Sequence, residues 1–192
     1  MITKNDKKML FYSYGDRGDV LMLKLVTPTI FYKKKYLEYM KSWNDEIILP
    51  VISDLRGRRF ETLLKELYQL EHEVYIPKGY MPEKNYLVID DQDDIVGFVN
   101  IRHFLNEVML NTKGQITYGI KPASRTKNIE EEILKLSLAE AKEIGIKQIK
   151  MVCNKSNSDL CRYIEDIGGQ FETEGYNEVD KYTIQRYLFH LE

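Results

Sequence analysis

The second half of the chain alternates strand-like and helical patterns, and this order restricts the fold more than any other feature. The strand patterns span residues 86–90, 95–101, 115–120, 146–153, 171–176 and 182–191. The helical patterns span residues 128–144 and 160–167. The resulting order, β-β-β-α-β-α-β-β, predicts an α/β (α+β) fold in which helices flank a mixed, mostly antiparallel central sheet.

The first half predicts an appendage and two helices. Residues 9–14 and 20–26 are strand-like, and the polar, glycine-containing stretch between them predicts a hairpin. Thr27 and Pro28 are suited to open a helix, and an apolar stripe predicts a second helix beginning near Phe60. We therefore expect one domain over residues 23–192 and an N-terminal strand or hairpin extension over residues 1–22.

Charge and cysteine usage exclude several classes of function. A net charge of −2 provides no general attraction to nucleic acid or to anionic lipid. The two cysteines, Cys153 and Cys161, and the three histidines form no recognisable zinc spacing. The chain starts without the apolar run of a signal peptide. We expect a cytoplasmic protein with no metal, nucleic-acid or membrane partner.

Four segments carry a resemblance to a known family. They are residues 96–106, residues 118–125, Asn157 with the downstream pair Gly168-Gly169, and residues 184–187. Their order and spacing resemble a bacterial branch of the GNAT superfamily, the acetyl-coenzyme A-dependent N-acetyltransferases. The resemblance runs from about residue 23 to residue 191. It implies a GNAT-like fold, acetyl-CoA as co-substrate, and transfer of an acetyl group to a primary amine of a small molecule or an amino-acid-like acceptor.

The resemblance also implies where acetyl-CoA binds. In the family a strand ends, the chain turns, and a helix begins with its free N–H groups aimed at the pyrophosphate. The residues of this chain that match these positions are Ile120, Lys121, Arg125, Thr126, Lys127, Asn128, Ile129, Glu130 and Asn157.

The loop at residues 125–130 departs from the family pattern. Members usually read Arg/Gln-x-x-Gly-x-Gly/Ala, whereas Asn128 and Glu130 occupy the two small positions here. A carboxylate about 4 Å from a phosphate charge costs ~1 kcal/mol in water. Two interpretations stay open: the loop retains coenzyme A through its other residues, or it is the acidic start of a helix that binds no nucleotide.

The catalytic groups follow from the same resemblance. A backbone N–H near Ile120 or Lys121 would polarise the thioester carbonyl. His103 and Glu107 are the candidate bases, since they follow the central strand and share a face if that segment is helical. The position that carries a tyrosine acid in many family members is Ile164, and we expect the adjacent Tyr163 to be a half-buried packing residue.

Three functions remain from the sequence. The first is an N-acetyltransferase for a small-molecule amine, with a homodimer left open. The second is a non-catalytic GNAT-fold protein that binds a metabolite or a protein partner. The third is an acyltransferase that uses another thioester.

Overall fold

The computed structural model describes residues 22–191. The strand expected over residues 9–14, and all but the last residue of the extension expected over 1–22, lie outside the described residues. The strands are β1 (Lys24–Val26), β2 (Glu83–Ile89), β3 (Ile95–Arg102), β4 (Ile116–Ile120), β5 (Gln148–Asn154), β6 (Gln170–Asn177) and β7 (Tyr182–His190). The α-helices are α1 (Lys33–Lys41), α2 (Phe60–Glu71), α3 (Glu107–Thr112), α4 (Lys127–Glu143) and α5 (Ser158–Asp166). Short 3-10 turns are η1 (Ile30–Tyr32), η2 (Val51–Ser53) and η3 (Pro122–Ser124).

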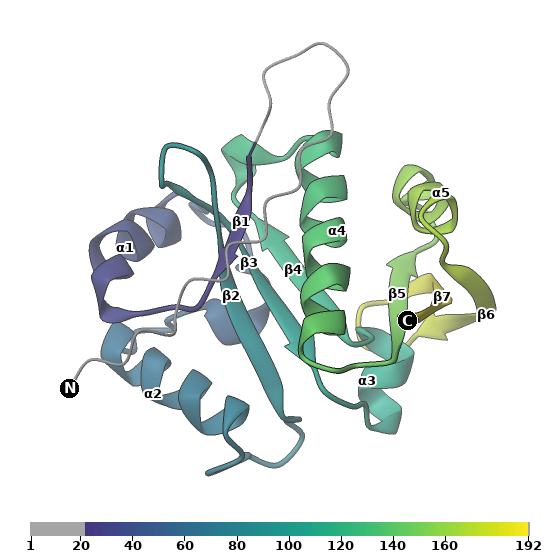
Figure 1. Cartoon of the computed structure of the whole chain (residues 1–192), viewed down its shortest axis with the longest axis horizontal. Coiled ribbons are helices and arrows are strands. Elements are labelled where there is room, and N and C mark those ends of the chain that lie inside the picture. The colour runs from purple at the N-terminus through teal and green to yellow at the C-terminus, as the bar shows by residue number, and fades with distance from the viewer. Residues whose placement is uncertain (1–21, 192) are drawn as a thin grey trace.

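The strands form two antiparallel sheets. One has the order β1-β2-β3-β4, and the other has the order β5-β7-β6. Helices lie on both faces of the first sheet, with α1 and α2 on one side and α4 on the other (Figure 1). The expectation of an α+β fold with helices around an antiparallel sheet is confirmed, with the sheet divided in two.

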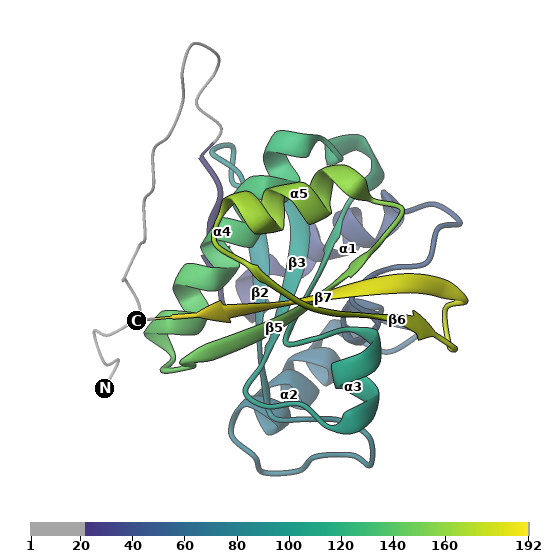
Figure 2. The same ribbon diagram turned by 90° about the vertical axis from the view of Figure 1, so that its right-hand side faces the viewer.

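The two sheets are joined at one point. An antiparallel bridge pairs Gly114 with Met151, and the N–H of Gln115 donates to the carbonyl of Lys150 over 2.8 Å. Past this bridge, the described parts of β4 and β5 share no further ladder, and α4 lies between them in the view of Figure 1. Figure 2 shows the second sheet with α5 above it and α3 below it. The separation leaves one edge of β4 without a strand partner.

Two apolar cores fix the layers. On one side, Tyr36 of α1, Trp43 of the turn after α1 and Leu63 of α2 pack in one cluster with Phe98 of β3. On the other side, Ile133 of α4 belongs to a cluster that includes residues of both sheets. The removal of such apolar side chains from water is the main favourable contribution to folding. Helix α4 therefore holds the two sheets at a fixed separation.

Local sequence explains where α4 begins and ends. The Thr126 hydroxyl accepts from the N–H of Ile129 over 3.3 Å, as an N-cap does, and Gly145 closes the end with a φ of +86°. The structure places this helix within one residue of its predicted bounds at each end. The predicted start at Thr27-Pro28 is wrong, because the first turn is η1, whose cap position is Thr29.

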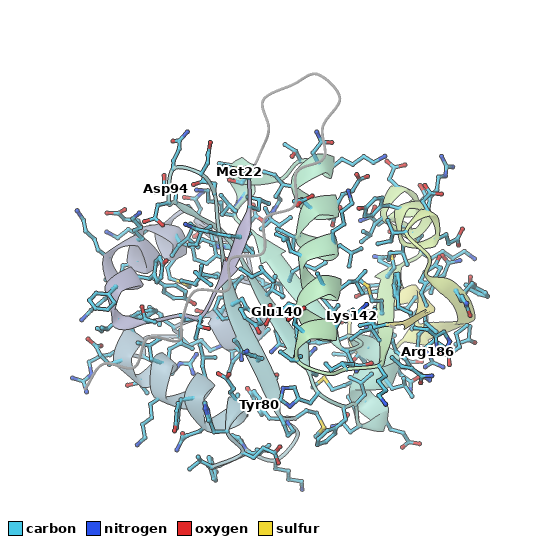
Figure 3. The ribbon with its side chains drawn as sticks, in the orientation of Figure 1. Met22, Tyr80, Asp94, Glu140, Lys142 and Arg186 are labelled. Atoms are coloured by element: carbon cyan, nitrogen blue, oxygen red, sulfur yellow. The ribbon has the colours of Figure 1, made fainter. Side chains whose placement is uncertain are left out.

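Helix α4 is also fastened to β2 by polar contacts. The Tyr86 hydroxyl donates to Glu140 over 2.5 Å, and the Lys84 ammonium lies 3.7 Å from the same carboxylate. Figure 3 shows Glu140 in this position, between α4 and β2. Lys84 also lies 3.9 Å from Glu71 of α2, so its side chain reaches helices on both faces of the sheet. None of the helices formed by residues 22–191 has the length and apolar character needed to cross a membrane.

Gly119 of β4 allows the segment after α1 to lie directly on the sheet. A Cβ atom at this position would be 1.9 Å from the carbonyl oxygen of Leu49, which is backbone and cannot rotate away. The absence of a side chain at Gly119 therefore sets the distance between β4 and the segment that contains Leu49.

We expect Gly119→Ala to destabilise the protein by about 1–3 kcal/mol, because the added methyl group overpacks this contact. Chemical denaturation with circular dichroism measures the loss. The matched control is Gly175→Ala in β6, where the nearest atom to an added Cβ is 4.0 Å away. Equal stability of the two variants would contradict the proposed contact.

Candidate functional site

A cavity of about 730 Å³ opens beside the free edge of β4. Its walls come from four segments: the turn after α1, the end of β4, the start of α4 and the start of α5. These segments are distant in the sequence, and the separation of the two sheets brings them together. The volume is in the range of small-molecule sites.

The free edge of β4 presents backbone donors to this side. The N–H of Lys121 donates to the carbonyl of Val96 over 2.9 Å, and Ile120 faces Gly97 in the ladder. Because antiparallel pairs alternate, the N–H groups of Tyr118 and Ile120 point away from β3. Of the two predicted carbonyl-polarising donors, only Ile120 faces the open side, since the Lys121 N–H is already bonded within the sheet.

The glycine-poor loop has ordinary backbone geometry. Thr126 is extended with a φ of −133°, Lys127 begins the helix, and no residue of 125–130 has a positive φ. Asn128 therefore does not need the left-handed conformation that a glycine would permit. The N–H groups of Lys127 and Asn128 have no acceptor within the helix, as at any helix start.

Glu130 points toward the sheet. Its carboxylate accepts a hydrogen bond from the Tyr118 hydroxyl over 2.9 Å. Burial raises the pKa of Tyr118 and the neighbouring Glu130 carboxylate raises it further, so the hydroxyl keeps its proton and stays a donor. The next carboxylate, Glu131, lies 3.6 Å from the Lys127 ammonium one turn earlier. Glu130 nevertheless remains part of the cavity wall.

Arg125 crosses the cavity from the loop before α4 to the turn after α1. Its Nε donates to the carbonyl of Ile120 over 3.0 Å, and its Nη1 lies 2.6 Å from the carboxylate of Glu46. The guanidinium carbon is 5.2 Å from the centre of the Trp43 ring, a cation–π distance. Arg125 thus connects β4, the acidic Glu46 and the buried Trp43.

Helix α5 contributes a cap and a tyrosine. The Asn157 side chain accepts from the N–H of Leu160 over 3.3 Å and lines the cavity. Tyr163 is half-buried, as expected, but it also lines the cavity, and its hydroxyl donates to the carbonyl of Glu131 over 3.3 Å. Burial raises the pKa of Tyr163, and Lys135 partly opposes this shift. Ile164 lies in the core instead.

The structure brings together most of the predicted cofactor residues. Those that line the cavity are Ile120, Arg125, Thr126, Lys127, Glu130 and Asn157. Ile129 is 8% exposed and packs in the core, while Asn128 is exposed outside the cavity lining. The Lys121 side chain lines a separate hollow of about 120 Å³, together with residues such as Asp94, which is labelled in Figure 3.

The structure does not bring the predicted bases to the cavity. His103 follows β3 at the end where Ile101 pairs with the first residue of β4, whereas the cavity adjoins the last residues of β4. The two residues also share no helix face, because α3 begins only at Glu107, where Asn106 caps it. A catalytic role for His103 and Glu107 stays a prediction from the sequence.

The turn after α1 is the part of the site that sequence reasoning missed. Trp43, Glu46, Ile47 and Leu49 line the cavity. One signal was available in the sequence: three consecutive apolar residues, Ile47 to Leu49, directly follow Asp45 and Glu46. In the structure Ile47 and Leu49 are exposed, while Ile48 is partly buried. Its position against β4 depends on Gly119 and could not be inferred from spacing.

Comparison with known proteins identifies the fold. No protein-family model matches the chain, and no curated protein matches it in sequence. Among solved structures, the microcin C7 self-immunity acetyltransferase MccE, in complex with acetyl-CoA and AMP, aligns with a TM-score of 0.59 at 14% identity, covering 88% of this chain and 92% of that one. An acetyltransferase of the GNAT family from Bacillus anthracis aligns with a TM-score of 0.55 at 16% identity, covering 94% and 98%. The chain has the GNAT fold.

A third structure with the GNAT fold carries the cofactor alone. The ribosomal L7/L12 α-N-protein acetyltransferase RimL, in complex with coenzyme A, aligns with a TM-score of 0.57 at 14% identity, covering 88% of this chain and 94% of that one. Similarity at this level concerns the fold, and the activity of this chain has to be argued from its own residues.

The two cysteines lie behind the cavity wall. Cys161 of α5 donates to the sulfur of Cys153 in β5 over 2.8 Å, and both side chains are buried. Burial raises the pKa of the Cys153 thiol well above its usual value, with a smaller contribution from Cys161. Less thiolate is therefore present at any given pH than for an exposed cysteine.

We expect both thiols to react with a thiol-specific disulfide reagent at pH 8 at least about a hundredfold more slowly in the native protein than in denaturant. The rate should rise with pH, because deprotonation converts the thiol into the nucleophilic thiolate. Absorbance stopped-flow measures both rates. Fast native labelling of two thiols would show that this pair is accessible and not part of the packed core.

Proposed function

We propose that this protein is an N-acetyltransferase that transfers the acetyl group of acetyl-CoA to the primary amine of a small molecule. The observation that carries the proposal is the cavity at the free edge of β4, where the N–H groups of Tyr118 and Ile120 are directed away from β3 toward the starts of two helices. The complexes of MccE with acetyl-CoA and of RimL with coenzyme A, both with the same fold, support this choice of donor.

The residues that line the cavity are suited to bind acetyl-CoA. The N–H groups along the β4 edge would bind the amide-containing arm in the manner of an added strand. Arg125, Thr126 and Lys127, together with the free N–H groups at the start of α4, would hold the phosphates. Glu130 would stay hydrogen-bonded to Tyr118. This contact directs the negative charge of Glu130 toward the sheet and away from the axis of α4.

The chemistry required of the chain is polarisation, proton removal and orientation. Acetyl-CoA supplies a thioester whose carbonyl carbon the amine attacks. The Ile120 N–H group would stabilise the negative charge that develops on the carbonyl oxygen, while the Tyr118 N–H group would remain for the amide-containing arm. Tyr163 lines the cavity, its hydroxyl donates to the carbonyl of Glu131, and its side chain also interacts with Lys135; it is the group we assign to protonate the departing thiolate.

The charges of the cavity favour a cationic acceptor. Four carboxylates line it, those of Glu46, Glu130, Glu131 and Asp159, against two cationic side chains, Arg125 and Lys127. This excess attracts the ammonium form of an amine and offers acceptors for its proton. A neutral amine can then attack, which the reaction requires.

One observation favours the alternative function of a non-catalytic binding protein. The carboxylate of Glu130 stands in the cavity at the position that is small in family members, and it opposes phosphate binding. A protein that binds a metabolite without coenzyme A would keep the cavity and lose the donor.

The deciding experiment is thermal denaturation with and without acetyl-CoA, followed by an assay of thiol release with a panel of primary amines. Acetyl-CoA at about a hundred times its dissociation constant should stabilise the fold by about 2.7 kcal/mol. Thiol release should require an amine. A melting temperature unchanged by millimolar acetyl-CoA would rule out acetyl-CoA as the donor, and would leave the non-catalytic alternative and an acyltransferase that uses another thioester.

We further expect Glu130→Gln to tighten coenzyme A binding by about fivefold, because it removes a charge worth ~1 kcal/mol against phosphate. The amide oxygen can still accept from Tyr118, so the local structure is kept. Isothermal titration calorimetry measures the change. Glu132→Gln makes the same charge change on the same helix outside the cavity lining and should have less effect; an equal gain in both variants would point to net charge alone.

A further inference from the structure

The ion pair between Arg125 and Glu46 spans the cavity and joins its two halves. Arg125 belongs to the loop before α4, on the side of the proposed phosphate contacts, and Glu46 belongs to the turn after α1. The two side chains are 44% and 49% exposed, so the pair can exchange partners at little cost. One guanidinium therefore serves a cavity that has to accept two substrates.

The two substrates would interact with different members of this ion pair, the donor with Arg125 and the amine with Glu46. A pyrophosphate carries two negative charges, against one on a carboxylate, and can bind arginine through two parallel hydrogen bonds. It would draw the Nη atoms of Arg125 from Glu46, while the Nε of Arg125 stays on the carbonyl of Ile120. The carboxylate of Glu46 would then be the one anionic group on its wall of the cavity without a cation.

The neighbours of Glu46 indicate what such a carboxylate would bind. Ile47 is 79% exposed and Leu49 is 42% exposed, and both line the cavity beside it. Trp43 forms the floor, with its ring now covered by the Arg125 guanidinium. A carboxylate bordered by apolar side chains and an aromatic ring suits an ammonium group attached to an apolar substituent.

We propose that Glu46 binds the ammonium of an apolar primary amine, and that Arg125 blocks it until a phosphate-bearing donor draws Arg125 away. The inference rests on the proposed function, because the donor is taken to place phosphates at the start of α4. It makes binding of the two substrates positively coupled, and by reciprocity each raises the affinity for the other. The amine therefore binds more tightly when the donor is present, and the acceptor class is an apolar primary amine.

Removing Arg125 tests the role of Glu46 without any donor. We expect Arg125→Gln to bind 2-phenylethylamine about threefold to fivefold more tightly than the wild type does, as measured by calorimetry. Arg125→Lys, which can still pair with Glu46, should stay near the wild-type value. The double variant Arg125→Gln/Glu46→Gln should lose the gain, whereas a gain kept in the double variant would overturn the proposal. Circular dichroism checks that each variant is folded.

A second arm measures the coupling itself. In the wild type, saturating coenzyme A should tighten 2-phenylethylamine binding about threefold to fivefold, and emission of Trp43, the single tryptophan of the chain, should change on donor binding. Glu46→Gln should abolish the coupling and bind coenzyme A at least as tightly, while the adjacent Asp45→Asn should behave as the wild type. The neutral analogue 2-phenylethanol should show no coupling.

The outcomes separate this inference from the proposed function. Failure of coenzyme A to bind both the wild type and Glu46→Gln would remove the donor, and the Arg125→Gln titration would still decide whether Glu46 is the ammonium site. If coenzyme A binds, and Glu46→Gln binds 2-phenylethylamine as tightly as the wild type does, the proposed enzymatic function would stand and this inference would be overturned.

Discussion

The separation of β4 from β5 is the constraint on which the rest of the structure depends. One bridge at Gly114 and Met151 starts the two strands together, and the buried face of α4 then keeps them apart. A continuous sheet would have bonded the N–H groups of Tyr118 and Ile120 to a neighbouring strand. Because the strands part, these donors, the start of α4 and the start of α5 surround one cavity.

Three of the acidic side chains that line the cavity are held by short contacts, although carboxylates outnumber cationic side chains there. Glu130 is held by Tyr118, Glu131 by Lys127, and Glu46 by Arg125. The two ion pairs leave their partners partly open to solvent, so Glu131 and Glu46 can exchange partners. The glycine-poor loop thus differs from the family pattern in charge more than in backbone geometry, since residues 125–130 need no positive φ.

The sequence was sufficient to predict elements and insufficient to predict contacts between distant segments. Helix α4 was predicted to within a residue because an apolar period and a terminal glycine agree locally, and the structure adds Thr126 as its N-cap. The loop residues Arg125 to Lys127 line the cavity because they are contiguous with the start of this helix, and their role in cofactor binding stays a prediction. Glu46 and Trp43 were missed because their approach to β4 depends on the missing side chain of Gly119. His103 and Glu107 were paired on the assumption that one helix contains both, but α3 begins only at Glu107.

The single bridge between the sheets also sets how the cavity can vary. β4 and β5 meet at the bridge and are separated beyond it by α4, a helix of about 10 Å diameter. The angle between the two strands depends on the size of the α4 side chains. Ile133 and Leu134 are fully buried there, so their volumes determine the angle. Substitutions within the core could therefore adjust the width of the cavity without altering any residue that lines it.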